Sequence, residues 1–211
     1  MKKKINNQGI NLFIKKGNDL LMKKEKRKFE IDEDNRDAVN FFLAYFFKKG
    51  YYEEFNVNPN KGIYIHGDFG TGKSLLFQIL EEVYNEIRKN ELRIKTVNSV
   101  NLVDKFWVEI SNPNLLKQNN CSLLQKMSRG VIHFDDVGAE RKINHFGNSI
   151  EIISDIIQSR YFNSKNNSKI KTFITSNFSC EQIGERYGRR IYDRLFEMFN
   201  IIEIGGESRR R

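Results

Sequence analysis

Cysteine, histidine and proline are scarce in this sequence of 211 residues. The two cysteines, Cys121 and Cys180, lie far apart and have none of the spacings typical of zinc sites. The three histidines are equally scattered. The sequence therefore argues against a disulfide framework and a structural zinc site, and we expect a reducing, cytoplasmic setting.

Long apolar segments are also missing. No run reaches the 18 or so apolar residues that a membrane-spanning helix needs, and the longest apolar cluster is the short stretch 41–47 (FFLAYFF). The first residues, MKKKINN, are basic but lead into no apolar stretch, so they do not resemble a secretory signal. We expect no membrane partner.

Positive charge is concentrated at one end of the chain. The formal net charge is +9, and residues 1–28 contribute +8 of it, with ten Lys or Arg against Asp19 and Glu25. We therefore predict a basic N-terminal arm at residues 1–30 and a nearly neutral globular domain at residues 31–211. Two interpretations of the arm stay open: contact with nucleic acid or an acidic partner, and a solvated, partly disordered terminus.

Apolar stretches with strand and helix periodicity alternate along the rest of the chain. Five buried strands are expected at 62–67, 93–100, 129–138, 169–177 and 200–206. Helices are expected at 34–50, 74–90, 101–110, 123–127, 149–162 and 180–198. Strands that are apolar on both faces and separated by helices predict an α/β fold with a parallel sheet covered by helices.

A glycine-rich loop joins the first strand to the second helix. The segment GDFGTGKS matches G-x-x-x-x-G-K-[ST], with Gly67, Gly72, Lys73 and Ser74 at the fixed places. Glycines let such a loop turn its N–H groups around phosphate oxygens at a helix N-terminus. Lys73 reaches the β- and γ-phosphates in this arrangement, and the Ser74 hydroxyl ligates Mg²⁺.

Polar residues end two of the later strands. VIHFDDVG delivers Asp135 and Asp136 to the carboxyl end of a strand, the edge where ligands bind in such sheets. We expect Asp135 to hold Mg²⁺ through water and Asp136 to orient or deprotonate an attacking water. Asn177, at the end of KTFITSN, is placed to hydrogen-bond that water or the γ-phosphate, although an Asn that merely opens a turn fits the residue alone equally well.

Three arginines near the C-terminus, Arg189, Arg190 and Arg194, fit a role at a transferring phosphoryl group. Their spacing leaves open whether they act within one subunit or on a neighbour. For Arg194, an ion pair with Asp193 or Glu197 is an equal alternative.

Other conspicuous side chains are expected to be packed rather than to bind ligands, with Trp107 either in the core or at an interface. These residues are Phe41, Phe42, Tyr45, Phe46, Phe47, His66, Trp107 and His133.

The phosphate loop, FDDVGAE, TSN and GRRIYDRL, in this order, resemble AAA+ ATPases of the DnaC/IstB helicase-loader type over about residues 35–206. The resemblance implies a three-layer P-loop NTPase fold with a five-stranded parallel sheet of order 5-1-4-3-2 and no separate helical lid domain. It implies ATP and Mg²⁺ as cofactors, with Asp135 as the Walker B acid. Asp136 stands at the catalytic acid position, Asn177 at sensor 1, and Arg190 at the arginine finger.

The same resemblance suggests Arg209 or Arg210 as the sensor 2 arginine. The nucleotide-binding residues expected are Gly67, Asp68, Phe69, Gly70, Thr71, Gly72, Lys73, Ser74, Leu75 and Arg209, with Ser74 and Asp135 at the metal. By this resemblance the chain is a Mg²⁺-dependent ATPase that assembles as a homo-oligomer on single- or double-stranded DNA and engages a replicative helicase. An Asp in place of the Glu common at position 136 in AAA+ proteins is expected to slow hydrolysis.

Other functions share these motifs. A transposition helper of the IstB kind would engage a transposase with the same ATPase core. A P-loop small-molecule kinase is disfavoured because no acceptor motif accompanies the loop, and a nucleotide-gated binding module is disfavoured because every hydrolysis element is present. The N-terminal helicase-binding domain of DnaC-type loaders has no counterpart beyond the thirty or so residues of the basic arm.

Overall fold

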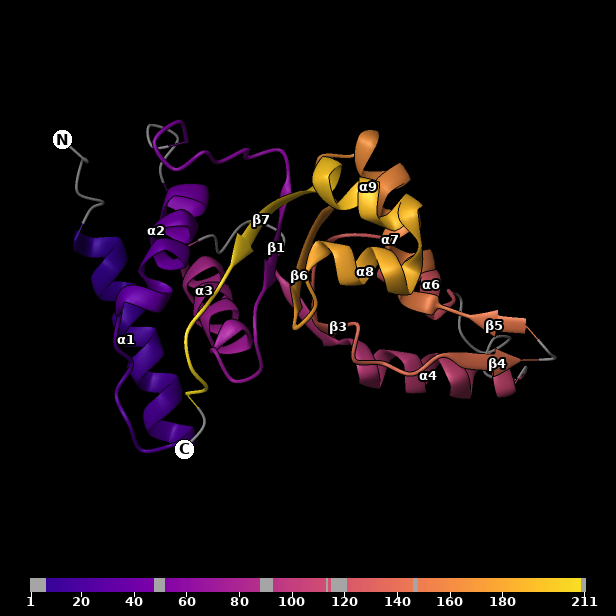
Figure 1. The fold of residues 1–211 in the computed structure, drawn as a ribbon, viewed down its shortest axis with the longest axis horizontal. Coiled ribbons are helices and arrows are strands. Elements are labelled where there is room, and N and C mark those ends of the chain that lie inside the picture. Colours follow the sequence, from indigo (N-terminus) through magenta and orange to yellow (C-terminus); the bar gives the residue numbers. More distant parts are fainter. Residues whose placement is uncertain are drawn as a thin grey trace.

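A computed structural model describes residues 7–47, 52–87, 93–112, 114, 121–145 and 148–209. Its main feature is a five-stranded sheet in the order β2-β3-β6-β1-β7, in which every neighbouring pair is parallel (Figure 1). The strands are β1 (Gly62–His66), β2 (Lys95–Asn98), β3 (Val131–Val137), β6 (Lys171–Ser176) and β7 (Phe199–Glu203).

This order differs from the expected 5-1-4-3-2 when all seven strands are numbered through the chain. The reason is a separate hairpin, β4 (Ile143–His145) with β5 (Asn148–Ile150), which enters the count between β3 and β6. Counted within the large sheet alone, the strands read 2-3-4-1-5, which is the expected sequence taken from the opposite edge.

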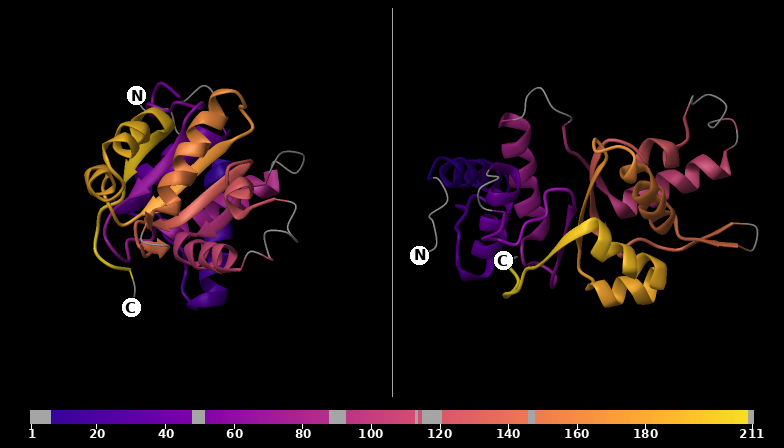
Figure 2. Two further views of the ribbon diagram at one scale, coloured as in Figure 1. Left: turned by 90° about the vertical axis from the view of Figure 1, so that its right-hand side faces the viewer. Right: turned by 90° about the horizontal axis from the view of Figure 1, so that it is seen from above.

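Helices cover both faces of the sheet and make three layers. In Figure 1, α1, α2 and α3 lie on one side and α4, α6, α7, α8 and α9 on the other, and the view from above in Figure 2 shows the same separation. The first group comprises α1 (Asn7–Lys24), α2 (Glu33–Phe47) and α3 (Lys73–Ile87). The second comprises α4 (Ser99–Ser111), α6 (Leu123–Met127), α7 (Ile152–Lys165), α8 (Cys180–Tyr187) and α9 (Arg189–Met198).

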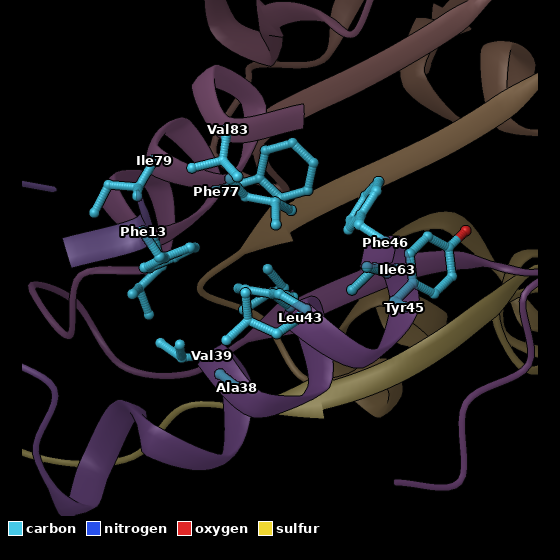
Figure 3. Packing of buried hydrophobic residues seen from close by; sticks show 14 of the residues in the cluster. Phe13, Ala38, Val39, Leu43, Tyr45, Phe46, Ile63, Phe77, Ile79 and Val83 are labelled. Carbon is cyan, nitrogen blue, oxygen red and sulfur yellow. The ribbon is translucent and has the colours of Figure 1, made fainter. Parts of the chain in front are cut away.

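Each face of the sheet has its own apolar core. Along β1, Ile63 and Ile65 join the cluster under α2 and α3, whereas Tyr64 joins the cluster under α7 and α9. This alternation follows from the period of two in a strand. Figure 3 shows the first cluster, in which Leu43 and Phe46 of α2 approach the sheet from below α3. The parallel sheet buried on both faces confirms the predicted α/β class.

The aromatic side chains of α2 are core residues, as predicted. Phe42 is fully buried, Tyr45 and Phe46 are nearly so, and Phe41 packs at the margin of the cluster. The side chain of Phe47 lies outside the described residues. Trp107 does not lie in the core, because its side chain is 36% exposed on α4, where it makes an edge contact with the ring of His145; the alternative of an interface position stays a prediction.

The basic arm is not a solvated tail over its described part. Residues 7–24 form α1, and Phe13 and Leu21 of this helix are buried in the same core as α2 and α3 (Figure 3). Gly17 leaves room for the ring of Phe29, and the Asn18 side chain accepts the Phe29 N–H at 2.7 Å, which folds the chain back after the helix. The expected boundary at residue 30 therefore falls inside one packed unit, since apolar residues on both sides of it share a core.

Other boundaries moved by a few residues. The helix expected at 149–162 runs from Ile152 to Lys165, because the residues before it pair in the β4–β5 hairpin. The strand expected at 93–100 ends at Asn98, whose side chain caps α4 by accepting the Asn101 N–H at 3.1 Å. After β7, the described residues 204–209 form no helix. Within the described residues, no helix is long and apolar enough to cross a membrane.

Candidate functional site

The glycine-rich loop leaves β1 and enters α3 with three glycines in left-handed backbone conformations. The φ angles are +148° at Gly67, +83° at Gly70 and +94° at Gly72. A Cβ atom at Gly67 would collide with the Ile204 carbonyl oxygen, and one at Gly70 with the Ser208 side chain. Glycine is therefore required at these places both by backbone conformation and by the segment after β7 that packs against the loop.

Lys73 is the first residue of α3 and lies inside the loop. Its side chain is 5% exposed, and its Nζ donates hydrogen bonds to the carbonyl oxygens of Gly67 at 2.8 Å and Asp68 at 2.6 Å. The hydroxyl of Thr71 donates to the Asp68 carbonyl at 3.0 Å. The ammonium group thus stands at the N-terminus of α3, where free N–H groups and the helix dipole favour an anion.

Ser74 and Asp135 meet across the sheet edge. The Ser74 hydroxyl donates to Asp135 Oδ1 at 2.8 Å, and the Thr175 hydroxyl on the neighbouring strand donates to the same oxygen. Hydroxyl and carboxylate oxygens are the donors that Mg²⁺ prefers, and Mg²⁺ commonly takes one or two protein ligands and completes its octahedron with water and phosphate. The pair fits such an ion. Within the described residues, no cluster of three or more acidic, His or Cys side chains offers a different cation site.

Asp136 follows Asp135 at an irregularity in β3. The pairing of β3 with β6 shifts register between Phe134 and Val137, and Asp136 has a φ of +57°. This conformation costs a non-glycine residue on the order of 1 kcal/mol, and strain of this kind gathers at functional sites. The carboxylate accepts a 3.4 Å hydrogen bond from the Asn98 side chain at the end of β2. The bulge turns two successive carboxylates toward one cavity.

That cavity has a volume of about 800 Å³ and lies along the carboxyl edge of the sheet. Both aspartates and Asn177 line it, together with the loop, the start of α3 and residues of the 21–35 segment. The expected residues on its wall are Phe69, Gly70, Thr71, Gly72, Lys73, Ser74, Leu75, Asp135, Asp136, Asn177 and Arg209. Gly67 and Asp68 stand behind the loop and supply the carbonyls that hold Lys73.

Arg209 ties the C-terminal segment to the start of α2. Its guanidinium makes a two-point contact with the Asp32 carboxylate, at 2.6 and 2.8 Å. The main-chain N–H of Arg209 donates to the Gly70 carbonyl at 2.9 Å. The hydrogen bond from Arg209 lowers the pKa of Asp32, and the same contact raises the pKa of Arg209. Asp32 also caps α2 by accepting the N–H groups of Asp34 and Asn35. The alternative candidate, Arg210, lies outside the described residues.

The arginines of α9 differ in their surroundings. Arg189 and Arg190 begin the helix, are exposed and do not line the cavity. Within the described parts of the chain, the Arg190 guanidinium has no hydrogen-bond or ion-pair partner. Arg194 instead lies over the rings of Tyr161 at 4.5 Å and Phe162 at 4.9 Å, which favours a packing role.

A buried ionic cluster that we did not predict from the sequence follows β3. Glu140 is 3% exposed, accepts the Gly138 N–H at 2.9 Å and contacts Arg186 and the hydroxyl of Tyr187. Burial and the neighbouring Glu140 carboxylate raise the pKa of Tyr187. The cluster fastens the turn after β3 to the end of α8, directly before the exposed arginines of α9.

His133 is packed, as predicted, but both of its ring nitrogens are hydrogen-bonded. It is 1% exposed and stacks on Phe77 of α3, with ring centroids 3.7 Å apart. Burial lowers its pKa to about 3. Its Nε2 lies 3.0 Å from the Thr175 hydroxyl, which contacts Asp135, so the ring is joined to the edge of the site.

A strand–glycine loop–helix unit with a carboxylate on a nearby parallel strand is the arrangement found in P-loop nucleotide-binding folds. Comparison with known proteins confirms the resemblance to the DnaC-type AAA+ ATPases. The chain is 26% identical over 193 residues to the replicative helicase loader DnaI of Bacillus subtilis (strain 168). The aligned region covers 86% of this chain and 56% of that protein. It therefore spans little more than half the length of this curated relative. The sequence matches no family model.

Solved structures show the same fold. A crystal structure of the DnaC helicase loader superposes with a TM-score of 0.58 at 22% identity, covering 85% of this chain and 94% of that one. AMPPCP-bound DnaA from Aquifex aeolicus superposes with a TM-score of 0.54 at 20% identity, covering 83% of this chain and 48% of that one. The predicted α/β fold with a five-stranded parallel sheet is thus confirmed.

Proposed function

We propose that this chain binds ATP with Mg²⁺ in the cavity at the sheet edge and hydrolyses it, and that it acts as an oligomeric DnaC-like helicase loader on DNA. One observation carries the proposal. Lys73 and Ser74 meet Asp135, which lies 61 residues after Ser74, beside a glycine loop that has no room for a Cβ atom at Gly67 or Gly70. This is the arrangement that phosphate oxygens and their metal ion require.

The cavity suggests how ATP would lie. Phosphates on the loop and the helix N-terminus would draw Lys73 from the carbonyls of Gly67 and Asp68, since an anion is the stronger partner for an ammonium group. The γ-phosphate would face the end lined by Asp136 and Asn177, and the nucleoside would lie toward the wall formed by residues 21–35. When bound, Mg²⁺ supplies charge neutralisation between the β- and γ-phosphates, with Ser74 and Asp135 holding it.

Hydrolysis would then use side chains already at that end of the cavity. Asp136 takes a proton from the attacking water, Asn177 orients the water or the γ-phosphate, and the bond between the γ-phosphorus and the bridging oxygen breaks to give ADP and phosphate. Arg190 is exposed and stands outside its own cavity, so we propose that it stabilises the transferring group in a neighbouring subunit. Arg209, paired with Asp32 at the cavity wall, is our candidate for sensor 2.

The assembly and partner assignments draw on the relatives. The curated relative is named a replicative helicase loader, and the solved DnaC structure is named a helicase loader. Residues 23–28 are exposed and basic except for Glu25, and Lys24, Arg27 and Lys28 of this segment line the cavity; such a segment suits contacts with DNA phosphates. The comparisons give no support to the transposase alternative.

The test is phosphate release by the purified chain, measured with and without Mg²⁺, single-stranded DNA and duplex DNA. Mass measurements with ATP-γ-S on the unmodified chain and on Arg190→Ala report whether subunits share sites. We expect Mg²⁺-dependent release and assembly with nucleotide, and slower release by the assembled variant. A chain that stays monomeric with nucleotide and DNA would contradict the shared-site mechanism, and phosphate transfer to an added nucleoside would favour a kinase.

A further inference from the structure

Asp135 is held by two hydroxyl groups on a single carboxylate oxygen. The hydroxyls of Ser74 and Thr175 both donate to Oδ1. Under the proposed function, Ser74 offers a lone pair of its hydroxyl oxygen to Mg²⁺, so its position depends on the ion. Thr175, which is 1% exposed on the adjacent strand, is the one of the two that does not hold the ion, and it orients the carboxylate whether or not the site is loaded.

Thr175 is itself oriented from behind by His133. A threonine hydroxyl has one proton, and here that proton is directed to Asp135. The contact of 3.0 Å between Thr175 Oγ1 and His133 Nε2 therefore requires an N–H on Nε2 that donates to the hydroxyl oxygen. The imidazole thus fixes the direction in which Thr175 donates.

The far side of the ring is also anchored. His133 Nδ1 lies 3.1 Å from the Thr96 hydroxyl on β2, and Thr96 in turn contacts the carboxyl group of Glu81 on α3. A neutral imidazole has one N–H, so with that proton on Nε2 the Nδ1 atom accepts the Thr96 proton. The contact between Thr96 and Glu81 then needs a proton on Glu81, whose pKa is raised by burial. Phe77 stacks on the ring with an interplanar angle of 23°, which prevents it from tilting. A continuous chain of contacts therefore runs from Glu81 through Thr96, His133 and Thr175 to Asp135.

An apolar residue would meet the packing demand at position 133 without this chain. The neighbouring positions Val131, Ile132 and Phe134 are apolar, and burying an imidazole in such a strand costs free energy unless its nitrogens are paired. The property that an imidazole adds here is a directional hydrogen bond toward Thr175. Outer partners of this kind tune a metal ligand when they fix its orientation.

We propose that His133 and Thr175 are positioning residues that aim Asp135 at the Mg²⁺ of a bound nucleotide. The proposal rests on the proposed function, because it concerns the same site. Removing an outer-shell partner typically costs 10–100-fold in metal affinity. Thr175→Val and His133→Leu are therefore expected to raise the Mg²⁺ concentration that half-saturates ATP binding by about tenfold.

The test compares nucleotide binding across a Mg²⁺ titration and in EDTA. Thr175→Val and His133→Leu should shift the Mg²⁺ midpoint and leave the metal-free affinity unchanged. His133→Gln, which can donate from a side-chain amide near the position of Nε2, should recover most of the loss. Thr172→Val is the matched control, because it removes a buried hydroxyl that also has a hydrogen-bond partner, Arg160 Nε at 2.8 Å, from the end of the same strand away from Asp135, so it reports the cost of the lost bond to folding without touching the carboxylate.

A second readout needs neither nucleotide nor metal. Nitrogen NMR of the imidazole in the free protein should report His133 with its proton on Nε2, and Thr175→Val should change that signal while Thr172→Val leaves it in place. With only three histidines in the chain, the signal is readily assigned. Because Thr175→Val keeps the shape of the side chain, it carries the test even if His133→Leu fails to fold.

The outcomes separate the two claims. If the unmodified chain binds no nucleotide, the proposed function fails. If it binds with a clear Mg²⁺ midpoint that Thr175→Val leaves within twofold of Thr172→Val, or if the free protein carries the His133 proton on Nδ1 alone, the positioning role is overturned and the proposed function stands.

Discussion

Replacing Arg160 by methionine is expected to destabilise the fold strongly. The guanidinium is fully buried on α7 and donates to the Thr172 hydroxyl at 2.8 Å and to four main-chain carbonyls at 2.6 to 3.1 Å. The four carbonyls belong to Met127, Arg129, Gly130 and Lys171. Arg160 thereby joins the amino ends of β3 and β6, the strands whose carboxyl ends carry the aspartates and Asn177.

The magnitude follows from these contacts. Methionine occupies a comparable volume but donates nothing, and each buried acceptor left without a partner costs about 1–3 kcal/mol. Relief from burying a charge offsets part of that cost, so we expect a net loss of about 3–5 kcal/mol, in the range for breaking buried charged networks. For a chain of this size, 1 kcal/mol lowers the melting temperature by about 2–4 °C, so the shift should be roughly 10 °C.

Urea unfolding followed by circular dichroism measures this loss. Arg129→Met is the control, because it makes the same substitution at an exposed side chain, where changes are usually within about 0.5 kcal/mol. An Arg160→Met protein that unfolds within about 1 kcal/mol of the unmodified chain would refute the argument, since the carbonyls could not then depend on the guanidinium.

Three further predictions concern the site. Gly70→Ala should abolish nucleotide binding in calorimetry while thermal unfolding still shows a folded protein, because the new methyl group forces the loop away from the C-terminal segment. Asp32→Asn should cost up to about 1 kcal/mol in urea unfolding at pH 7, because Arg209 loses its charged partner while the Asn oxygen still caps α2. The folded pKa of Asp32 is lowered, so its contribution is present above the unfolded pKa of about 3.8 and is lost as the pH falls through the lower folded pKa; an undiminished difference between the two proteins in acid would contradict the assignment. Arg190→Ala should leave ATP binding by the monomer unchanged and slow phosphate release by the assembled protein, as seen by comparing release at low and high protein concentration.

The chemistry of the site could be predicted from the sequence where it depends on local spacing. The phosphate loop fixes Lys73 and Ser74 within a few residues, and a buried strand that ends in two aspartates marks the place of the second carboxylate. Parallel strands bring their carboxyl ends to one edge, so these local patterns were sufficient to expect Ser74 and Asp135 together, and the structure joins them at 2.8 Å.

Contacts between distant segments could not be predicted in this way. Asp32 lies among acidic residues at the start of α2, yet its carboxylate also binds Arg209 at the other end of the chain. His133 is read as a core residue, yet its partners Thr96 and Thr175 lie on two other strands. A single sequence contains no signal for such pairings, because their register is set only when the sheet forms.

The N-terminal helix was missed for a different reason. Its charge dominated the interpretation, although Ile10, Phe13 and Leu20 recur at helical spacing and mark the face that packs on the core. Exposed lysines on the opposite face are compatible with that packing, so a basic segment need not be a solvated one.

Calorimetric titration of the chain with ATP and Mg²⁺ tests the central claim most directly, with Lys73→Ala as the decisive variant and Lys105→Ala, an exposed lysine on α4, as the control. We predict saturable binding to the unmodified chain and to Lys105→Ala, and a loss of at least tenfold in affinity for Lys73→Ala, which is about 1.4 kcal/mol. Absence of binding to the unmodified chain, or equal affinities for both variants, would contradict the account.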